Sequence, residues 1–196
     1  MDTFLNRTPG APNPQGPMLA AAWDFRNRDR LTNQQQLAAM NVTAWLYTSN
    51  KTGKDEIYVT RNITKNEIIT ALGAAETPQA EVGFHAEALA GQFFLTNISK
   101  SKVKQIFSER FPCSNKGGNN ALGCKQMLQN YFSLVPVYYM YQIYDTPKDG
   151  NAPVARALKD GYSRRQPYAF PKPPQVVEDP KGPHGELQSH YMIYQL

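Results

Sequence analysis

The segment VTAWLYTSNKTGKDEIYVTRN, residues 42–62, decides the fold class. Its two halves, 42–49 and 55–62, are rich in β-branched and aromatic residues, which favour strands. The loop NKTGK between them contains Gly53 flanked by polar residues, a pattern typical of a β-hairpin. We therefore expect two antiparallel strands here.

Helical and strand patterns alternate beyond this hairpin. Thr64 and Glu67 have the spacing of a capping box, which marks a helix start. Helices are expected over 31–41, 64–73, 85–97, 124–132 and 151–161, further strands over 102–110 and 135–145, and a strand or helix over 189–196. A hairpin followed by alternation predicts an α/β fold, a three-layer α/β/α sandwich with a mixed five-stranded sheet.

The distribution of proline and glycine divides the chain into three parts. Residues 1–17 are rich in proline and glycine and read as a flexible linker or extension. Residues 18–166 carry the alternating pattern of one domain, and the proline-rich residues 167–196 form an extension expected to pack on that domain. No run of apolar residues is long enough to cross a membrane, and the start of the chain does not resemble a signal peptide.

The chain is moderately basic, with a formal net charge of +5. A positive charge favours a polyanionic partner, but many basic proteins bind no nucleic acid. The basic residues that could contact phosphates are Arg61, Lys65, Lys116, Arg164 and Arg165. Solvated surface charge explains these residues about as well as a nucleic-acid contact does.

Both cysteines lie in the stretch FPCSNKGGNNALGC, residues 111–124. Cys113 and Cys124 could form a disulfide, serve as separate buried thiols, or bind a metal. His85 and Glu87 stand upstream in the stretch GFHAEALAG. Two thiolates and one imidazole suit Zn²⁺ and leave a fourth position for water, while a neighbouring carboxylate can move protons. Pro112 is expected to begin a helix whose amides stabilise the Cys113 thiolate.

The pattern His85-x-Glu87, then Pro112-Cys113, then Cys124 resembles that of the zinc-dependent cytidine deaminase-like superfamily, over residues 18–165. The resemblance implies that His85, Cys113 and Cys124 bind Zn²⁺ and that Glu87 is the catalytic proton shuttle. The family places its second cysteine three residues after the first, whereas here the decapeptide SNKGGNNALG intervenes. We expect this insertion to form a loop that affects substrate choice, with Cys124 restarting the helix.

The resemblance also implies residues that bind the substrate. These are Asn62, Phe84, Ala86 and Pro112, with Asn62 bonding the sugar or base. Aromatic side chains near the pocket would stack on the base. Phe84, Tyr58 and Tyr144 are candidates, although strand aromatics more often belong to the core.

The insertion and the triplet SER before FPC resemble bacterial polymorphic-toxin deaminases. This likeness implies deamination of cytosine to uracil in nucleic acid, with single-stranded DNA favoured over duplex DNA and RNA. It also implies a secreted effector acting in the cytoplasm of a target cell, and a cognate immunity protein. The alternatives are a deaminase of free nucleosides or nucleotides and a non-catalytic binding domain. An intact Glu87 argues against the non-catalytic alternative, because a structural metal site needs no proton shuttle.

Overall fold

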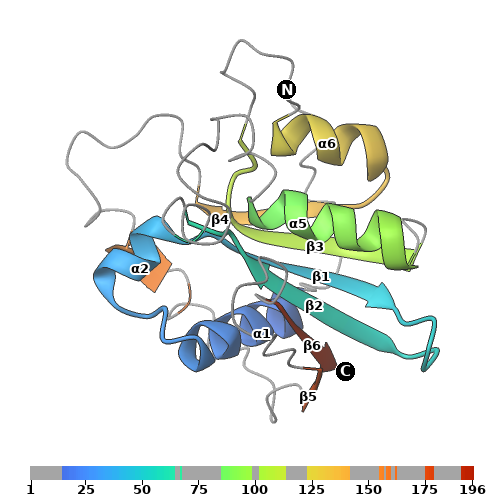
Figure 1. The fold of residues 1–196 in the computed structure, drawn as a ribbon, viewed down its shortest axis with the longest axis horizontal. Coiled ribbons are helices and arrows are strands. Elements are labelled where there is room, and N and C mark those ends of the chain that lie inside the picture. The colour runs from blue at the N-terminus through green and yellow to red at the C-terminus, as the bar shows by residue number, and fades with distance from the viewer. Residues whose placement is uncertain are drawn as a thin grey trace.

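The computed structural model describes residues 15–64, 67, 85–98, 102–113, 123–141, 155–156, 158–159, 162, 175–178 and 191–196. The helices are α1 (Gln15–Arg28), α2 (Gln34–Ala39), α5 (Ala86–Phe93), which continues into a π-helical turn (Phe94–Ile98), and α6 (Cys124–Tyr131). The strands are β1 (Val42–Thr48), β2 (Asp55–Arg61), β3 (Val103–Arg110), β4 (Val137–Tyr141), β5 (Gln175–Glu178) and β6 (Tyr191–Gln195). Figure 1 shows these elements as a ribbon.

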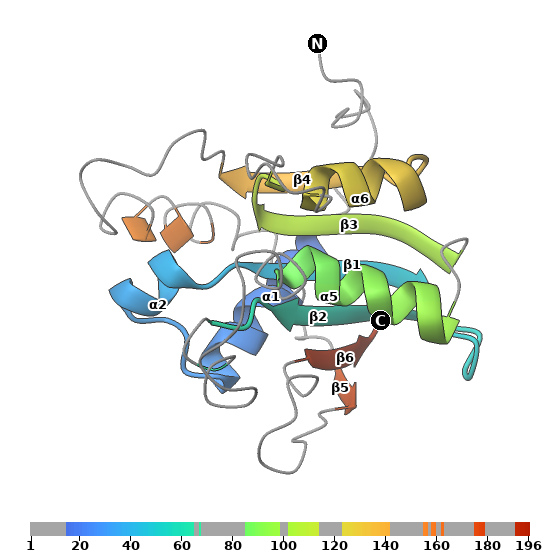
Figure 2. The same cartoon turned by 45° about the horizontal axis from the view of Figure 1, so that its top comes forward.

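The six strands form one mixed sheet in the order β4-β3-β1-β2-β6-β5, which Figure 2 shows from edge to edge. Only β3 and β4 run parallel, and the other neighbouring strands are antiparallel. The α/β class and the mixed sheet are confirmed, but the expected number of five strands is wrong. Two strands near the C-terminus, β5 and β6, extend the sheet beyond β2.

The predicted hairpin forms β1 and β2, with Val42 opposite Arg61 and Thr48 opposite Asp55. Gly53 in the connecting turn has a φ of 68°, a conformation that glycine adopts without steric cost. Alternate residues of these strands face opposite sides of the sheet. Ala44 packs on one side with α1, while Trp45 packs on the other with α5 and α6.

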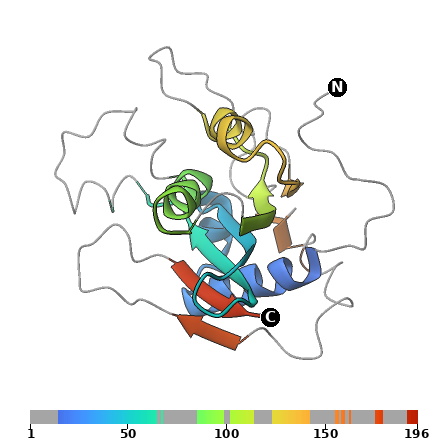
Figure 3. The same cartoon turned by 90° about the vertical axis from the view of Figure 1, so that its right-hand side faces the viewer.

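Helices therefore cover both faces of the sheet, as Figure 3 shows from one end. On one face, Met18, Ala21 and Phe25 of α1 are buried against the strands. On the other face, Phe94, which follows α5, and Leu128 of α6 pack around Trp45. Helix α1 was not among the predicted elements, and it begins at Gln15, within the segment assigned to the linker.

A buried ion pair fastens α1 to β3. The Arg26 guanidinium donates to both carboxylate oxygens of Glu109 at 2.6 Å, and both side chains are fully buried. Arg26 also donates to the Met40 carbonyl, and the Glu109 carboxylate accepts from the Val42 amide. These two hydrogen bonds fix the backbone on both sides of residue 41. Removing either charged side chain would leave the other as an uncompensated buried charge.

None of the helices among the described residues is both long enough and apolar enough to cross a membrane.

Candidate metal centre

His85, Cys113 and Cys124 meet where two helices begin and one strand ends. His85 is the N-cap of α5, and Cys124 is the first residue of α6. Cys113 follows the end of β3, which lies between the two neighbouring strands β1 and β4. The sheet and the two helix starts thus bring together three side chains that are up to 39 residues apart in sequence.

The three donor atoms lie at distances suited to a tetrahedral metal. The Nδ1 atom of His85 is 3.4 Å from each of the two sulfurs, and all three donor atoms lie within 4.8 Å of one another. A tetrahedral zinc site with Zn–S of about 2.3 Å and Zn–N of about 2.1 Å separates sulfur from nitrogen by roughly 3.6 Å. The cysteines are not joined in a disulfide. The cluster is thus close enough to hold a metal ion and is compatible with zinc.

The described residues add no carboxylate to this group of three ligands. Catalytic zinc sites typically use three protein ligands and keep one position open, whereas structural sites use four. The donor set of two thiolates and one imidazole therefore fits a zinc ion with an open position.

No helix begins at Pro112 as expected, because residues 111–113 are not helical. Instead, the first amide of α6, on Cys124, donates to the Cys113 sulfur at 3.5 Å, and the next, on Lys125, donates to the Cys113 carbonyl at 3.0 Å. A helix N-terminus does therefore stabilise the Cys113 thiolate, but the helix is the one that begins after the insertion.

The two thiols differ in acidity. Hydrogen bonds from the Cys124 thiol and from His85 outweigh burial and lower the pKa of Cys113 to about 4. The neighbouring Cys113 sulfur, burial and the Glu87 carboxylate all raise the pKa of Cys124. A cation shared by the two sulfurs would favour the thiolate form of both, because a coordinating thiol loses its proton.

Glu87 lies in the first turn of α5, two residues after His85, and is only 3% exposed. Its Oε1 atom accepts from Ser108 Oγ at 2.8 Å and from Asn41 Nδ2 at 3.0 Å. Burial raises the pKa of this carboxyl, and the hydrogen bonds from the Glu87 backbone and from Ser108 oppose the shift in part. Glu87 is therefore a buried carboxyl group held beside the ligand cluster.

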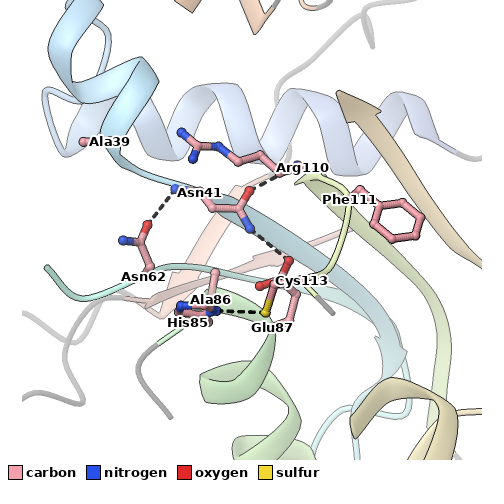
Figure 4. A pocket seen from close by; sticks show the side chains of 9 residues that line it. All are labelled: Ala39, Asn41, Asn62, His85, Ala86, Glu87, Arg110, Phe111 and Cys113. Carbon is pink, nitrogen blue, oxygen red and sulfur yellow. Dashed lines mark hydrogen bonds between the residues drawn. The ribbon is translucent and has the colours of Figure 1, made fainter. Parts of the chain in front are cut away.

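A cavity of about 300 Å³ opens onto this arrangement. Figure 4 shows His85, Glu87 and Cys113 on one side of it and Asn41, Asn62 and Arg110 on the other. A cavity of this size suits a small ligand or one base of a larger one. Two of the three candidate metal ligands, His85 and Cys113, and the buried carboxyl group of Glu87 thus face a common space.

The predicted substrate-binding residues have different outcomes. Asn62 and Ala86 line the cavity, and Pro112 is buried next to Cys113. Tyr58 belongs to the core, where its ring stacks on Phe93, which agrees with the core interpretation that the sequence analysis favoured for strand aromatics. Residues Phe84, Lys65, Lys116, Tyr144, Arg164 and Arg165 lie outside the described residues.

Arg61, proposed as a phosphate contact, has a structural role. Its guanidinium donates to the Glu67 carboxylate at 2.7 Å and lies 3.6 Å from Asp29, and its side chain is only 7% exposed. The predicted capping box is confirmed: the Thr64 amide donates to the Glu67 carboxylate and the Glu67 amide to the Thr64 hydroxyl.

The sequence analysis assigned no role to Asn41, Ser108, Arg110 or Phe111 at the site. Asn41, Arg110 and Phe111 line the cavity, and Ser108 bonds to Glu87. The polar triplet SER at the end of a buried strand was a usable signal, because alternation sends Ser108 and Glu109 to opposite faces. Asn41 carried no such signal, since it is one polar residue between a helix and a strand.

Comparisons of this chain with models of protein families, with curated proteins and with solved structures found no match.

Proposed function

We propose that this protein is a zinc-dependent deaminase that converts cytosine to uracil in nucleic acid, with single-stranded DNA as the favoured substrate. The observation that carries the proposal is that His85, Cys113 and Cys124 converge within 4.8 Å beside the buried Glu87, all near one cavity. The sequence resemblance to cytidine deaminase-like enzymes assigns the same roles to the same four residues. A mixed sheet with helices on both faces is compatible with that fold family.

Bound zinc would supply a Lewis acid that makes water a nucleophile near neutral pH. Glu87 would then carry the proton transfers. Its carboxylate takes a proton from the attacking water, passes it to the ring nitrogen, and moves a second proton to the departing amino group. Water and cytosine thereby yield uracil and ammonia, and Glu87 returns to its starting protonation state.

The remaining cavity residues would bind and orient the base. The Asn62 carboxamide lines the cavity and can donate a hydrogen bond to the sugar or base, and Ala86 lines the wall beside His85. Pro112 is buried next to Cys113, where it supports that ligand. Arg110 supplies a positive charge beside the cavity, which favours a substrate that carries phosphate. These features support nucleic acid or a nucleotide over an uncharged base.

The biological setting follows from the resemblance alone. The insertion between the cysteines and the SER triplet resemble toxin deaminases delivered by secreted bacterial proteins. On that basis we propose action in the cytoplasm of a target cell, with a cognate immunity protein as partner.

The proposal is tested by incubating purified protein with single-stranded DNA, duplex DNA, RNA and free cytidine. Uracil formation is measured beside zinc content for the wild type, Glu87→Gln and Glu87→Ala. We expect conversion of single-stranded DNA by the wild type, and a loss of at least about 100-fold in both variants with zinc retained, since general acid–base catalysis contributes about 10²–10⁴-fold.

Glu56→Gln is the matched control, because Glu56 is also a buried glutamate but bonds to Tyr47 and Thr52 in the hairpin. Conversion of free cytidine alone would establish the nucleoside deaminase instead. Bound zinc without conversion of any substrate would contradict the enzyme proposal.

A further inference from the structure

Asn41, between α2 and β1, joins the parts of the candidate site. Its Nδ2 group donates to Glu87 Oε1 at 3.0 Å and to Ser108 Oγ at 3.2 Å. Its Oδ1 atom accepts from the Arg110 amide at 3.2 Å. Figure 4 shows this carboxamide between β3 and the Glu87 carboxylate. One side chain thus links the end of β3 to the first turn of α5.

The main chain of Asn41 holds a second cavity residue. Its N–H donates to Asn62 Oδ1 at 2.6 Å, and its carbonyl accepts from the Asn62 N–H at 3.1 Å. Because the Oδ1 atom of Asn62 accepts this hydrogen bond, the NH₂ group of the same carboxamide points away from Asn41 (Figure 4). Asn41 therefore sets which end of Asn62 is offered to a ligand.

The backbone around Asn41 is itself fixed by the buried ion pair. Arg26 holds the carbonyl of the preceding Met40, and Glu109 holds the amide of the following Val42. Both charged side chains are fully buried. The contacts of Asn41 are thus made from a rigid support, as precise positioning of a reacting group requires.

We propose that Asn41 is a positioning residue, which holds the Glu87 carboxylate for proton transfer and presents the NH₂ group of Asn62 to the substrate. This inference rests on the proposed function. Asn41 and Ser108 both bond to Oε1, so the two side chains together fix the orientation of the Glu87 carboxylate. Displacing a reacting group by about 1 Å can lower the rate about 100-fold, so losing this contact lowers kcat.

Asn41→Asp removes the hydrogen bonds that the NH₂ group of Asn41 donates to Glu87 and to Ser108. Aspartate has the same shape and keeps an acceptor for the Arg110 amide, but it places an oxygen where the NH₂ group donated to Glu87. We expect kcat on single-stranded DNA to fall about 10- to 100-fold, the effect of losing a hydrogen bond to a charged group. Zinc content and the Co²⁺–thiolate absorption of cobalt-substituted protein stay unchanged, and KM changes less than about threefold.

Asn130→Asp is the matched control for the added charge. Asn130 is exposed on α6 and uses its oxygen as an acceptor from Gln126, which aspartate retains. Its kcat and KM are expected to match the wild type. A normal kcat in Asn41→Asp, or a raised KM with kcat intact, would overturn the positioning role.

A stability measurement tests the contact without any activity. In the double variant Asn41→Asp, Glu87→Gln, the donor and the acceptor exchange sides, so the hydrogen bond is restored. We expect Asn41→Asp alone to lower the midpoint of urea unfolding and the double variant to recover at least half of the loss. Additive losses would overturn the inference. If the wild type converts no substrate, the proposed function fails and this unfolding cycle still decides whether Asn41 holds Glu87.

Discussion

His85 can reach both sulfurs because its side chain takes no part in capping α5, although its backbone occupies the N-cap position. It is the N-cap residue with extended dihedral angles, and its side chain makes no capping hydrogen bond. An N-cap side chain usually satisfies the first amides of the helix. At this position the imidazole is directed toward Cys113 and Cys124 instead.

Replacing a ligand should remove the metal and leave the fold largely intact. We expect His85→Ala, Cys113→Ser and Cys124→Ser each to weaken zinc binding at least about 100-fold, because even changes around the ligands cost about 10–100-fold. Competition with a chromophoric chelator measures the affinity, and circular dichroism checks the fold. His184→Ala serves as the control histidine. Wild-type zinc affinity in any ligand variant would exclude that residue as a ligand.

The residue types of the site were predictable, but their surroundings were not. His85, Glu87, Cys113 and Cys124 could be selected as candidates because the order of these residue types along the chain is rarely found by chance. Asn41 and Ser108 reach Glu87 only through strand pairing and helix docking, across 46 and 21 residues. No local pattern in the sequence reports such contacts.

At the level of elements, the start of α6 explains how a ten-residue insertion is compatible with the site. The amides of Cys124 and Lys125 bond to Cys113 as though the helix continued from it. The strands predicted over 42–49, 55–62 and 102–110 and the helices at 85 and 124 are confirmed because each has a strong local pattern. Of the strand predicted over 135–145, the structure shows Val137–Tyr141, and residues 142–145 lie outside the described part of the chain. The helix predicted over 31–41 is shorter, Gln34–Ala39, with Asn33 as its N-cap.

The helix α1 was missed although its buried residues Met18, Ala21, Ala22 and Phe25 have helical spacing. Arg26 interrupts this apolar pattern, and its burial is explained only by Glu109, 83 residues away in the sequence. No local pattern in the sequence could identify Glu109 as the partner of Arg26.

The capping box predicts a pH dependence of stability. Burial favours the neutral form of Glu67, but hydrogen bonds from Arg61 and Thr64 prevail and lower its pKa from 4.5 to about 2. A lowered pKa in the folded state stabilises the protein above pH 4.5, and the contribution is lost as the pH falls toward 2.

Glu67→Gln should therefore lower the free energy of unfolding at pH 6 by about 1 kcal/mol, a value reduced by solvent screening because the side chain is 34% exposed. The difference from the wild type should vanish as the pH approaches 2. Urea unfolding from pH 6 to pH 3 measures it. Asp55→Asn, which removes the exposed ion pair with Lys104, is the control and should have little effect. A constant difference between wild type and Glu67→Gln at all pH values would contradict the assignment.

For the whole molecule, the C-terminal strand β6 is part of the core. Met192, Ile193 and Tyr194 are buried, and β6 pairs with β2 along the hairpin that begins the sheet. The sequence pattern of residues 189–196 fits a strand and a helix equally well, because eight residues of mixed pattern do not decide between them. The segment forms a strand because it pairs with β2, which lies more than 100 residues earlier in the sequence.

Tyr194→Ala tests this dependence. The Tyr194 side chain is fully buried and its hydroxyl donates to Asp24 of α1 at 3.1 Å. We expect a loss of about 3–5 kcal/mol in the free energy of unfolding, as for other buried aromatic residues. Tyr131→Ala, at a tyrosine that is 42% exposed, should cost much less. Equal losses in the two variants, measured by urea unfolding, would show that β6 is not part of the core.

The most direct test of the central claim is uracil formation in a single-stranded oligonucleotide, measured per mole of bound zinc. We predict that the wild type converts cytosine, that chelation of the metal abolishes conversion and added Zn²⁺ restores it, and that Glu87→Gln binds zinc equally but converts at least about 100-fold more slowly. Conversion that survives complete removal of the metal, or that Glu87→Gln retains in full, would contradict the account.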